Sequence, residues 1–225
     1  MRPPSVWIFD QGAAIYDWFT SQPPWWASCA RLVEGLPPNA RVLDLGCGPG
    51  VSSIVVARAR PDVRVVGIDL AGRMLTRARR HIGRARLQHR IHLVRASALT
   101  LPMPSASVDA VIGHSFLYLV SDRAAVLAET LRVLRPGGLA AFMEPHSAPA
   151  RPRAVLAQSR DPRFLVSVSL WRPFSRLHGR FSDRSLRDTL VTAGFEDVGI
   201  EPVLGGLGLI GRGRKPSQRV GLVPR

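Results

Sequence analysis

The sequence contains few of the features that mark a secreted, membrane-spanning or metal-binding protein. Its only cysteines, Cys29 and Cys47, are too few for a disulfide framework. No apolar run reaches the roughly 18 residues that cross a bilayer. The N-terminus carries Pro3, Pro4 and Asp10 where a signal peptide needs an unbroken apolar stretch. No spacing of histidine, cysteine and carboxylate residues is typical of a metal site. We therefore expect a protein of the reducing cytoplasm with no bound metal.

Lysine is almost absent as well. Arginine supplies 30 of the 31 basic residues, and these outnumber 16 acidic residues to give a formal net charge of +15. The excess lies in two segments. Residues 71–100 hold eight arginines and no acid, and residues 151–225 hold fourteen basic residues against six acidic ones. This uneven distribution predicts a basic surface rather than an evenly charged one.

The first basic segment has the periodicity of an amphipathic helix. Its apolar stripe is Met74, Ala78 and Ile82. The opposite face carries Arg73, Arg77, Arg80 and Arg84. Like charges at this spacing destabilise an isolated helix by about 0.2–0.5 kcal/mol per pair. Two interpretations stay open here: a solvated face, or a surface for an anion such as a lipid headgroup, nucleic acid or an acidic partner.

Apolar runs alternate with helical patterns along most of the chain. The runs near residues 42–44, 65–68, 90–94, 107–113, 139–143 and 196–203 are typical of strands, and an Ala- and Leu-rich helix precedes residue 134. This alternation, in a chain long enough for one well-buried domain, predicts an α/β fold with a parallel sheet.

Residues 42–50 contain the most informative motif. An apolar run ends at Asp44, and glycines follow at positions 46, 48 and 50, so that a ligand can approach the backbone closely. The next strand ends at Asp69, where dinucleotide-binding folds place a carboxylate on a ribose. The spacing is G-x-G-x-G, which differs from the G-x-G-x-x-G of pyrophosphate-binding turns. It resembles motif I of the class I S-adenosylmethionine (SAM)-dependent methyltransferases, in which the loop holds an amino-acid tail.

Four more motifs resemble that family in the same order. They are residues 96–103, similar to the stretch that holds adenine; residues 107–113, similar to strand four; residues 134–138, similar to the turn into strand five; and residues 193–203, similar to strand six. The resemblance extends from about residue 38 to about residue 213. It implies a Rossmann-like, doubly wound fold with a seven-stranded mixed sheet and helices on both faces. It also implies SAM as the cofactor.

The resemblance assigns roles to individual residues. The SAM contacts that it implies are Asp44, Gly46, Cys47, Gly48, Gly50, Asp69, Leu70, Met74, Ser97, Ala98, His114 and Ser115. At position 97 the family commonly carries an aspartate, and the Ser97 hydroxyl can also accept a hydrogen bond from the adenine amino group. The candidate general bases are His114, His146 and Tyr16, because histidine accepts protons near neutral pH and Tyr16-Asp17 resembles the family's N-terminal Tyr-Asp pair. For His146 a purely structural loop contact is an equal alternative. His81, His89 and His92 are expected at the surface.

We divide the chain into three parts. Residues 1–37, with four of the five tryptophans, form an aromatic helical arm that we expect to act as a lid. Residues 38–215 form the SAM-binding domain, in which residues 147–182 alternate arginine with large apolar groups on the expected acceptor side. Residues 216–225 are a tail whose last four residues match the remnant of an engineered thrombin site.

The expected activity is methyl transfer from SAM to a small or lipid-like acceptor, such as a phospholipid headgroup or a quinone-type compound (EC 2.1.1.-). Tryptophan and arginine together suit a water–lipid interface, so peripheral association with an anionic inner membrane surface is part of this expectation. The first alternative is an RNA methyltransferase. The charge favours it, but residues 113–116 read Gly-His-Ser-Phe where an Asn-Pro-Pro-Tyr type of tetrad would stand. The second alternative is a non-catalytic SAM-binding interaction protein.

Overall fold

The computed structural model describes residues 22–217, and within them seven strands form a single sheet in the order β3-β2-β1-β4-β5-β7-β6. Each pair of neighbouring strands among β1 to β5 is parallel, and β7 runs antiparallel to both β5 and β6. The strands are β1 Arg41–Leu45, β2 Arg64–Asp69, β3 Ile91–Arg95, β4 Val108–His114, β5 Leu134–Pro145, β6 Glu196–Val203 and β7 Gly208–Arg214. The predicted seven-stranded mixed sheet is confirmed.

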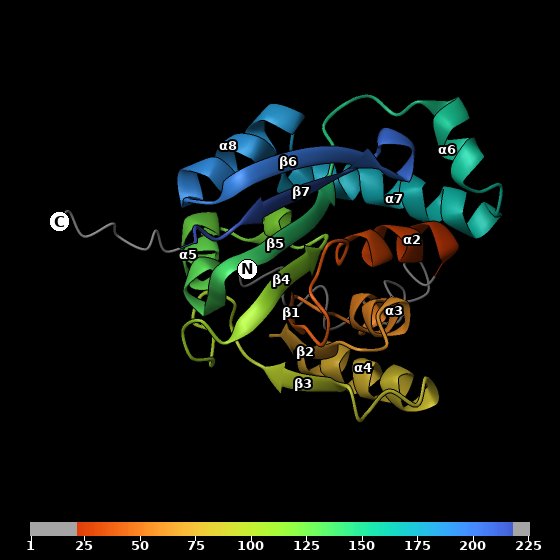
Figure 1. Cartoon of the computed structure of the whole chain (residues 1–225). Coiled ribbons are helices and arrows are strands. Elements are labelled where there is room, and N and C mark those ends of the chain that lie inside the picture. Colours follow the sequence, from red (N-terminus) through yellow and green to blue (C-terminus); the bar gives the residue numbers. More distant parts are fainter. Residues whose placement is uncertain (1–21, 218–225) are drawn as a thin grey trace.

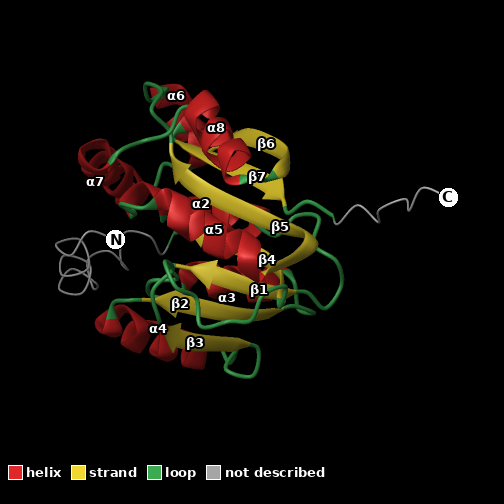
Figure 2. Cartoon of the chain, turned by 90° about the vertical axis from the view of Figure 1, so that its left-hand side faces the viewer, coloured by secondary structure: helices red, strands yellow, loops and turns green. Residues whose placement is uncertain are grey.

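Helices cover both faces of this sheet. They are α2 Pro23–Arg31, α3 Val51–Ala59, α4 Gly72–Arg84, α5 Arg123–Val133, α6 Pro152–Gln158, α7 Pro162–His178 and α8 Asp183–Ala193, with short 3-10 turns η1 Leu117–Leu119 and η2 Leu204–Gly206. In Figure 1 the sheet lies between α2, α3 and α4 on one side and α5 and α8 on the other. Figure 2 shows the twist of the sheet from β3 to β6.

Two apolar cores form because successive strand residues point to opposite faces of the sheet. In β1, Val42 belongs to the core beneath α3 and α4, whereas Leu43 belongs to the core beneath α5 and α8. Val56 of α3 and Leu190 of α8 are fully buried in these respective cores. Burial of each such side chain contributes about 1.5–3 kcal/mol. The central strands are therefore enclosed on both faces, and only their ends can offer a site.

The predicted turn before strand five lies inside β5, as a bulge. Leu134 pairs with Val108 and Leu139 with Ala110, so residues 135–138 have no partner in β4, and Gly137 has a φ of 75°. One expectation about local structure was wrong. His81 is half-buried rather than at the surface, and its Nδ1 lies 3.0 Å from the carbonyl oxygen of Pro49. That contact ties α4 to the loop after β1. His89 and His92 are exposed, as expected.

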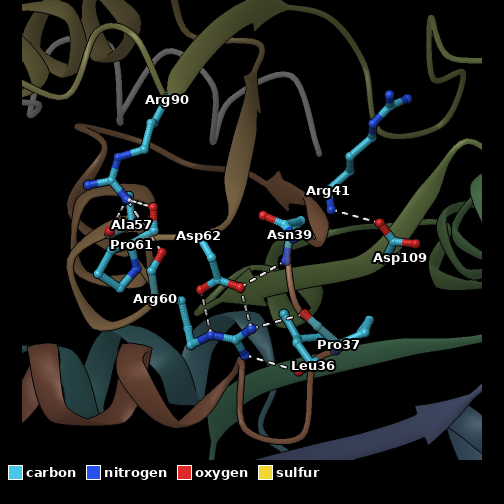
Figure 3. Close-up of polar contacts among 10 residues, drawn as sticks. All are labelled: Leu36, Pro37, Asn39, Arg41, Ala57, Arg60, Pro61, Asp62, Arg90 and Asp109. Atoms are coloured by element: carbon cyan, nitrogen blue, oxygen red, sulfur yellow. Dashed lines mark hydrogen bonds and ion pairs between the residues drawn. The ribbon is translucent and has the colours of Figure 1, made fainter.

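Some of the arginines hold the fold together. Figure 3 shows Asp62 accepting two hydrogen bonds from Arg60, whose guanidinium also donates to the carbonyl of Leu36. The Arg60 guanidinium holds the pKa of Asp62 well below its usual range. Arg90 donates to the carbonyl of Ala57 at the end of α3. Part of the arginine excess therefore serves to fasten loops and helix ends.

The predicted arm and tail are only partly described. Residues 1–21, including Tyr16 and the tryptophans at positions 7 and 18, and residues 218–225 lie outside the described residues. The end of the arm, from Pro23, forms α2, and residues 147–182 contain α6 and α7. No helix within residues 22–217 is long and apolar enough to cross a membrane.

Candidate functional site

The loop after β1 is joined to the end of β2 by a carboxylate. Gly46 and Gly48 have φ values of 65° and 51°, a conformation that glycine adopts at little cost. The amide of Gly48 donates to Oδ2 of Asp69 at 2.9 Å, and the amide of Ala71 donates to Oδ1 at 2.8 Å. Asp69 therefore holds two loops together at the carboxyl edge of the sheet, where open α/β sheets bind ligands.

A second carboxylate, Asp44, is fully buried beneath the same loop. Its Oδ2 accepts hydrogen bonds from the hydroxyls of Ser52 and Ser53, each at 2.6 Å. Its Oδ1 has no hydrogen-bond partner among the residues that the structure describes. Burial raises the pKa of Asp44 to about 6. Since a buried polar atom without a partner costs free energy, this oxygen fits a cationic ligand group such as the ammonium of an amino-acid tail.

Two small cavities open on either side of Gly46. The first also contains Ile68, Asp69, Leu70, Ala96, Ser97, Ala98, Leu99, Phe116 and Val126. The second also contains Trp25, Cys29, Cys47, Gly48, Pro49, Val51, Ser52 and His114. Eight of the residues expected to contact SAM therefore line one cavity or the other: Gly46, Cys47, Gly48, Asp69, Leu70, Ser97, Ala98 and His114.

Four of the expected contacts lie elsewhere. Asp44 is beneath the loop, as described. Gly50 packs on α4, where an added Cβ would come within 3.1 Å of the Ala78 Cβ, and Met74 is buried in the same helix. Ser115 is buried and its amide donates to the carbonyl of Met143 at 2.7 Å. Gly50, Met74 and Ser115 line neither cavity. Their positions accord with packing roles, and contact with a cofactor stays a prediction for them.

The ring of Phe116 lies directly against Gly46 and lines the first cavity. A side chain at position 46 would collide with this ring. The absence of a Cβ at Gly46 therefore leaves room for this ring.

His114 ends β4 and reaches the second cavity. Its Nε2 lies 3.0 Å from the hydroxyl oxygen of Ser28, and that hydroxyl donates to the carbonyl of Trp25 at 2.7 Å. Because serine has a single hydroxyl proton, its oxygen accepts from the Nε2–H of His114, and Nδ1 carries the lone pair. Burial lowers the pKa of His114 to about 4. The ring is thus neutral near pH 7.

Trp25 connects this cavity to the expected acceptor-side segment. Its Nε1 donates to the hydroxyl of Ser167 in α7 at 3.2 Å. Its ring meets Trp171 edge-on, with 4.9 Å between ring centroids, and Phe164 at 6.4 Å. Residues 147–182 therefore form an aromatic wall behind α2. The sequence showed the aromatic residues of both segments, but nothing in it paired Ser28 with His114.

Glu144 is a further residue that the sequence analysis missed. It is fully buried, and its carboxylate accepts hydrogen bonds from the amides of Phe116, Leu117 and Tyr118 at 3.2, 2.8 and 3.1 Å. Burial raises its pKa to about 7, and the three amide bonds act in the opposite direction. Glu144 thus positions the loop that carries Phe116. The available signal was a charged residue at the end of an otherwise apolar strand.

His146 lies in a different environment. Its Nδ1 is 3.0 Å from the carbonyl oxygen of Gly206, and its Nε2 is 3.1 Å from Oδ2 of Asp183. It lines a separate cavity of about 580 Å³ with Arg31 and Arg151. The structure does not bring His146 together with His114 in either cavity beside Gly46. Tyr16, the third candidate base, lies outside the described residues.

Within residues 22–217, no cluster of three or more histidine, cysteine, aspartate or glutamate side chains could hold a metal ion. Residues 42–138, which run from β1 through the start of β5, match the family described as methyltransferase domain. Over these residues the chain carries a methyltransferase domain, and its relatives and fold support a class I SAM-dependent methyltransferase. SAM is the cofactor of this family, and the unpaired oxygen of Asp44 and the bare backbone at Gly46 fit its amino-acid end.

The chain is 40% identical over 110 residues to 27-O-demethylrifamycin SV methyltransferase of Amycolatopsis mediterranei, covering 48% of this chain and 40% of that protein. It is 33% identical over 159 residues to demethylmenaquinone methyltransferase of Deinococcus radiodurans, covering 64% and 65%. The chain thus spans less than two thirds of either relative. Phosphoethanolamine N-methyltransferase 2 of Haemonchus contortus, solved with SAM, shares the fold with a TM-score of 0.68 at 16% identity, covering 92% of this chain and 57% of that one.

Proposed function

We propose that this protein transfers a methyl group from SAM to a small or lipid-like acceptor. The observation that supports this most is the pair of buried carboxylates at the ends of β1 and β2. Asp44 has an unpaired oxygen beneath the glycine loop that is suited to an ammonium, and Asp69 lines a cavity beside Gly46 where ribose hydroxyls would lie. Ser97 and Leu70 line the same cavity and would border the adenine.

When bound, SAM supplies an electrophilic methyl group on a sulfonium that is already a good leaving group. The protein must then align the acceptor, exclude water and accept a proton where the acceptor loses one. His114 is suited to the last task, because its neutral ring lines the cavity and Ser28 directs its lone pair to Nδ1. Trp25 and the aromatic residues of α7 enclose this side of the site.

The lipid-like acceptor is the finer part of the proposal. One relative is named as a demethylmenaquinone methyltransferase. In α7, Val166, Leu170 and Leu177 are 46%, 52% and 82% exposed, so the acceptor-side segment presents apolar groups to its surroundings. We also propose that residues 1–37 act as a lid and that the protein works in the cytoplasm, at the inner surface of the membrane.

Calorimetry with SAM, S-adenosylhomocysteine and NAD tests the cofactor assignment. We expect the two adenosyl ligands to bind and NAD to show no heat. Asp69→Ala should weaken SAM binding by about 1.5–3 kcal/mol, because the ribose loses a charged acceptor. Asp188→Ala, on the exposed face of α8, is the matched control and should bind SAM normally. Equal affinity in wild type and Asp69→Ala would contradict the assignment.

Turnover separates the enzyme from its alternatives. The protein is incubated with methyl-labelled SAM and with lipid, quinone or RNA fractions. We expect label in a lipid or quinone fraction. Label in RNA would support the RNA methyltransferase instead. SAM binding without label in any fraction would support a non-catalytic SAM-binding protein, since the fold alone does not ensure an activity.

A further inference from the structure

A groove of about 580 Å³ opens between α2, α3 and α4, which lie at the middle and lower right of Figure 1. Its apolar lining is Trp26, Val51, Ile54, Val55, Ala59 and Ala85. Its polar lining is Arg58, His81 and Arg84. The Trp26 side chain is 40% exposed, which is unusual for so large an apolar group. The groove therefore combines an apolar floor with a cationic rim.

The surface around the groove is strongly basic. Between Asp69 and Asp109 the chain has no acidic residue. Several arginines of this stretch are engaged within the fold, as Arg90 and Arg95 are through bonds to backbone carbonyls. Other guanidinium groups are exposed and make no hydrogen bond or ion pair within the described part of the chain: those of Arg79, Arg80, Arg84 and Arg86 in this stretch, and that of Arg58 in α3. Their charge is not neutralised by the protein, so it is available to an external anion.

We propose that this groove and its arginine rim dock the protein on a membrane surface that contains anionic lipid. Arginine and tryptophan are stable at such an interface, because the guanidinium reaches the headgroups while the indole enters the boundary with the acyl chains. The apolar floor fits part of an acyl chain, and the rim fits the phosphate. Charge alone would also attract RNA, but RNA has no need of an apolar floor beneath the arginines.

The groove adjoins the proposed active site. Val51 lines both the groove and the cavity that contains His114. His81, at the rim, is bonded to Pro49 of the cofactor loop, and Trp26 follows Trp25 of the second cavity. Docking here would bring a lipid headgroup close to the cofactor loop. The functional role of this docking rests on the proposed lipid-like acceptor. The docking itself can be tested separately, because vesicle binding can be measured without any methyl transfer.

The first test compares sedimentation of the protein with two kinds of vesicle at low salt. We expect binding to phosphatidylcholine mixed with phosphatidylglycerol and little binding to phosphatidylcholine alone. The triple variant Arg58→Gln, Arg80→Gln, Arg84→Gln should lose roughly 100-fold in partitioning, since each arginine near such a surface contributes about 1 kcal/mol. The control triple Arg153→Gln, Arg160→Gln, Arg176→Gln removes the same charge from exposed positions in and beside α6 and α7 and should lose less than about threefold.

The second test examines the apolar floor. Trp26→Ala should reduce vesicle binding by about tenfold while leaving SAM affinity unchanged, whereas Val191→Ala, an exposed apolar residue on α8, should change neither. Vesicles with brominated acyl chains should quench the tryptophan fluorescence of the wild-type protein more than that of the Trp26→Phe variant.

Four results would overturn the proposal. The first two are equal losses of vesicle binding in the two arginine triple variants and equal binding to anionic and neutral vesicles. The third is unchanged vesicle binding in Trp26→Ala. The fourth is displacement of the protein from vesicles by RNA of equal charge, together with methyl label in the RNA. Shielding of Trp26 from acrylamide without lipid would assign the groove to another part of the chain or to a second copy. Anionic vesicle binding with no label in any acceptor would instead count against the proposed catalysis and leave the docking in place.

Discussion

Two histidines stand at the same edge of the sheet, at the ends of neighbouring parallel strands, and their surroundings differ completely. His114 ends β4 and bonds to a neutral serine hydroxyl inside the cavity beside Gly46. His146 follows β5 and lies between a carbonyl and the carboxylate of Asp183 in another cavity. A strand end thus indicates where a ligand can bind, while the neighbours of a side chain decide what it can do there.

The largest expected effect on turnover comes from removing the imidazole rings of His114 and His146, one at a time. His114→Ala should lower turnover by about 10²–10⁴-fold, the usual loss of a general base, while His146→Ala should change it less than about fivefold. Initial rates at saturating SAM measure both. Calorimetric SAM affinity serves as the control for folding. A large loss in His146→Ala alone would reverse the comparison.

The pH dependence of stability should separate His114 from Glu144, the residue two before His146. The unfolded chain binds the His114 proton near pH 6.5 and the folded chain only near pH 4. Between these values the unfolded state holds more protons, so the stability that His114 contributes is lost as pH falls. His114→Gln should reduce that loss, which is about 3 kcal/mol at most.

For Glu144 the sign is opposite. Its pKa rises from 4.5 in the unfolded chain to about 7 in the folded one, so the folded state holds more protons between these values and gains stability as pH falls. Glu144→Gln should remove that gain. Urea unfolding at several pH values measures both variants. Parallel pH profiles for wild type and the two variants would contradict these signs.

A smaller effect is expected from the partner of His114. Ser28→Ala should lower turnover by about fivefold to tenfold, because the ring loses one hydrogen bond of about 1 kcal/mol and its preferred tautomer. SAM affinity should not change, and Ser28→Thr should restore most of the rate. An unchanged rate in Ser28→Ala would show that the bond does not orient the ring for catalysis.

The smallest effect is expected from the partner of His146. Asp183 has a side chain that is 63% exposed, and exposed pairs contribute about 0–1 kcal/mol. Asp183→Ala should therefore shift the free energy of unfolding by less than about 1 kcal/mol and leave turnover unchanged. Thermal unfolding and initial rates test this. A marked loss of turnover would give the second cavity a part in catalysis.

Much of the architecture could be predicted because it depends on local patterns. Consecutive apolar residues such as Val42 and Leu43 predict a strand enclosed on both faces. The spacing of Gly46 and Gly48 predicts a loop that a ligand can approach. The family motifs add order along the chain, and with it the seven-stranded sheet. The sequence indicated the turn at residues 134–138 but not the pairing of Leu134 with Val108 ahead of it, because that pairing depends on a strand distant in the sequence.

The site was only half predictable. Asp44, Asp69 and His114 stand in motifs or at strand ends, so the sequence identified them as candidates. The sequence by itself determined the fold class, the glycine loop and the carboxylates beneath it, since these depend on residues close together in the chain. Only the tertiary structure decided that Ser28 meets His114, that Glu144 holds the Phe116 loop, and that His146 turns to Asp183. These contacts join residues that are 28 to 86 positions apart for His114 and Glu144, and no local periodicity encodes which distant elements pack against each other.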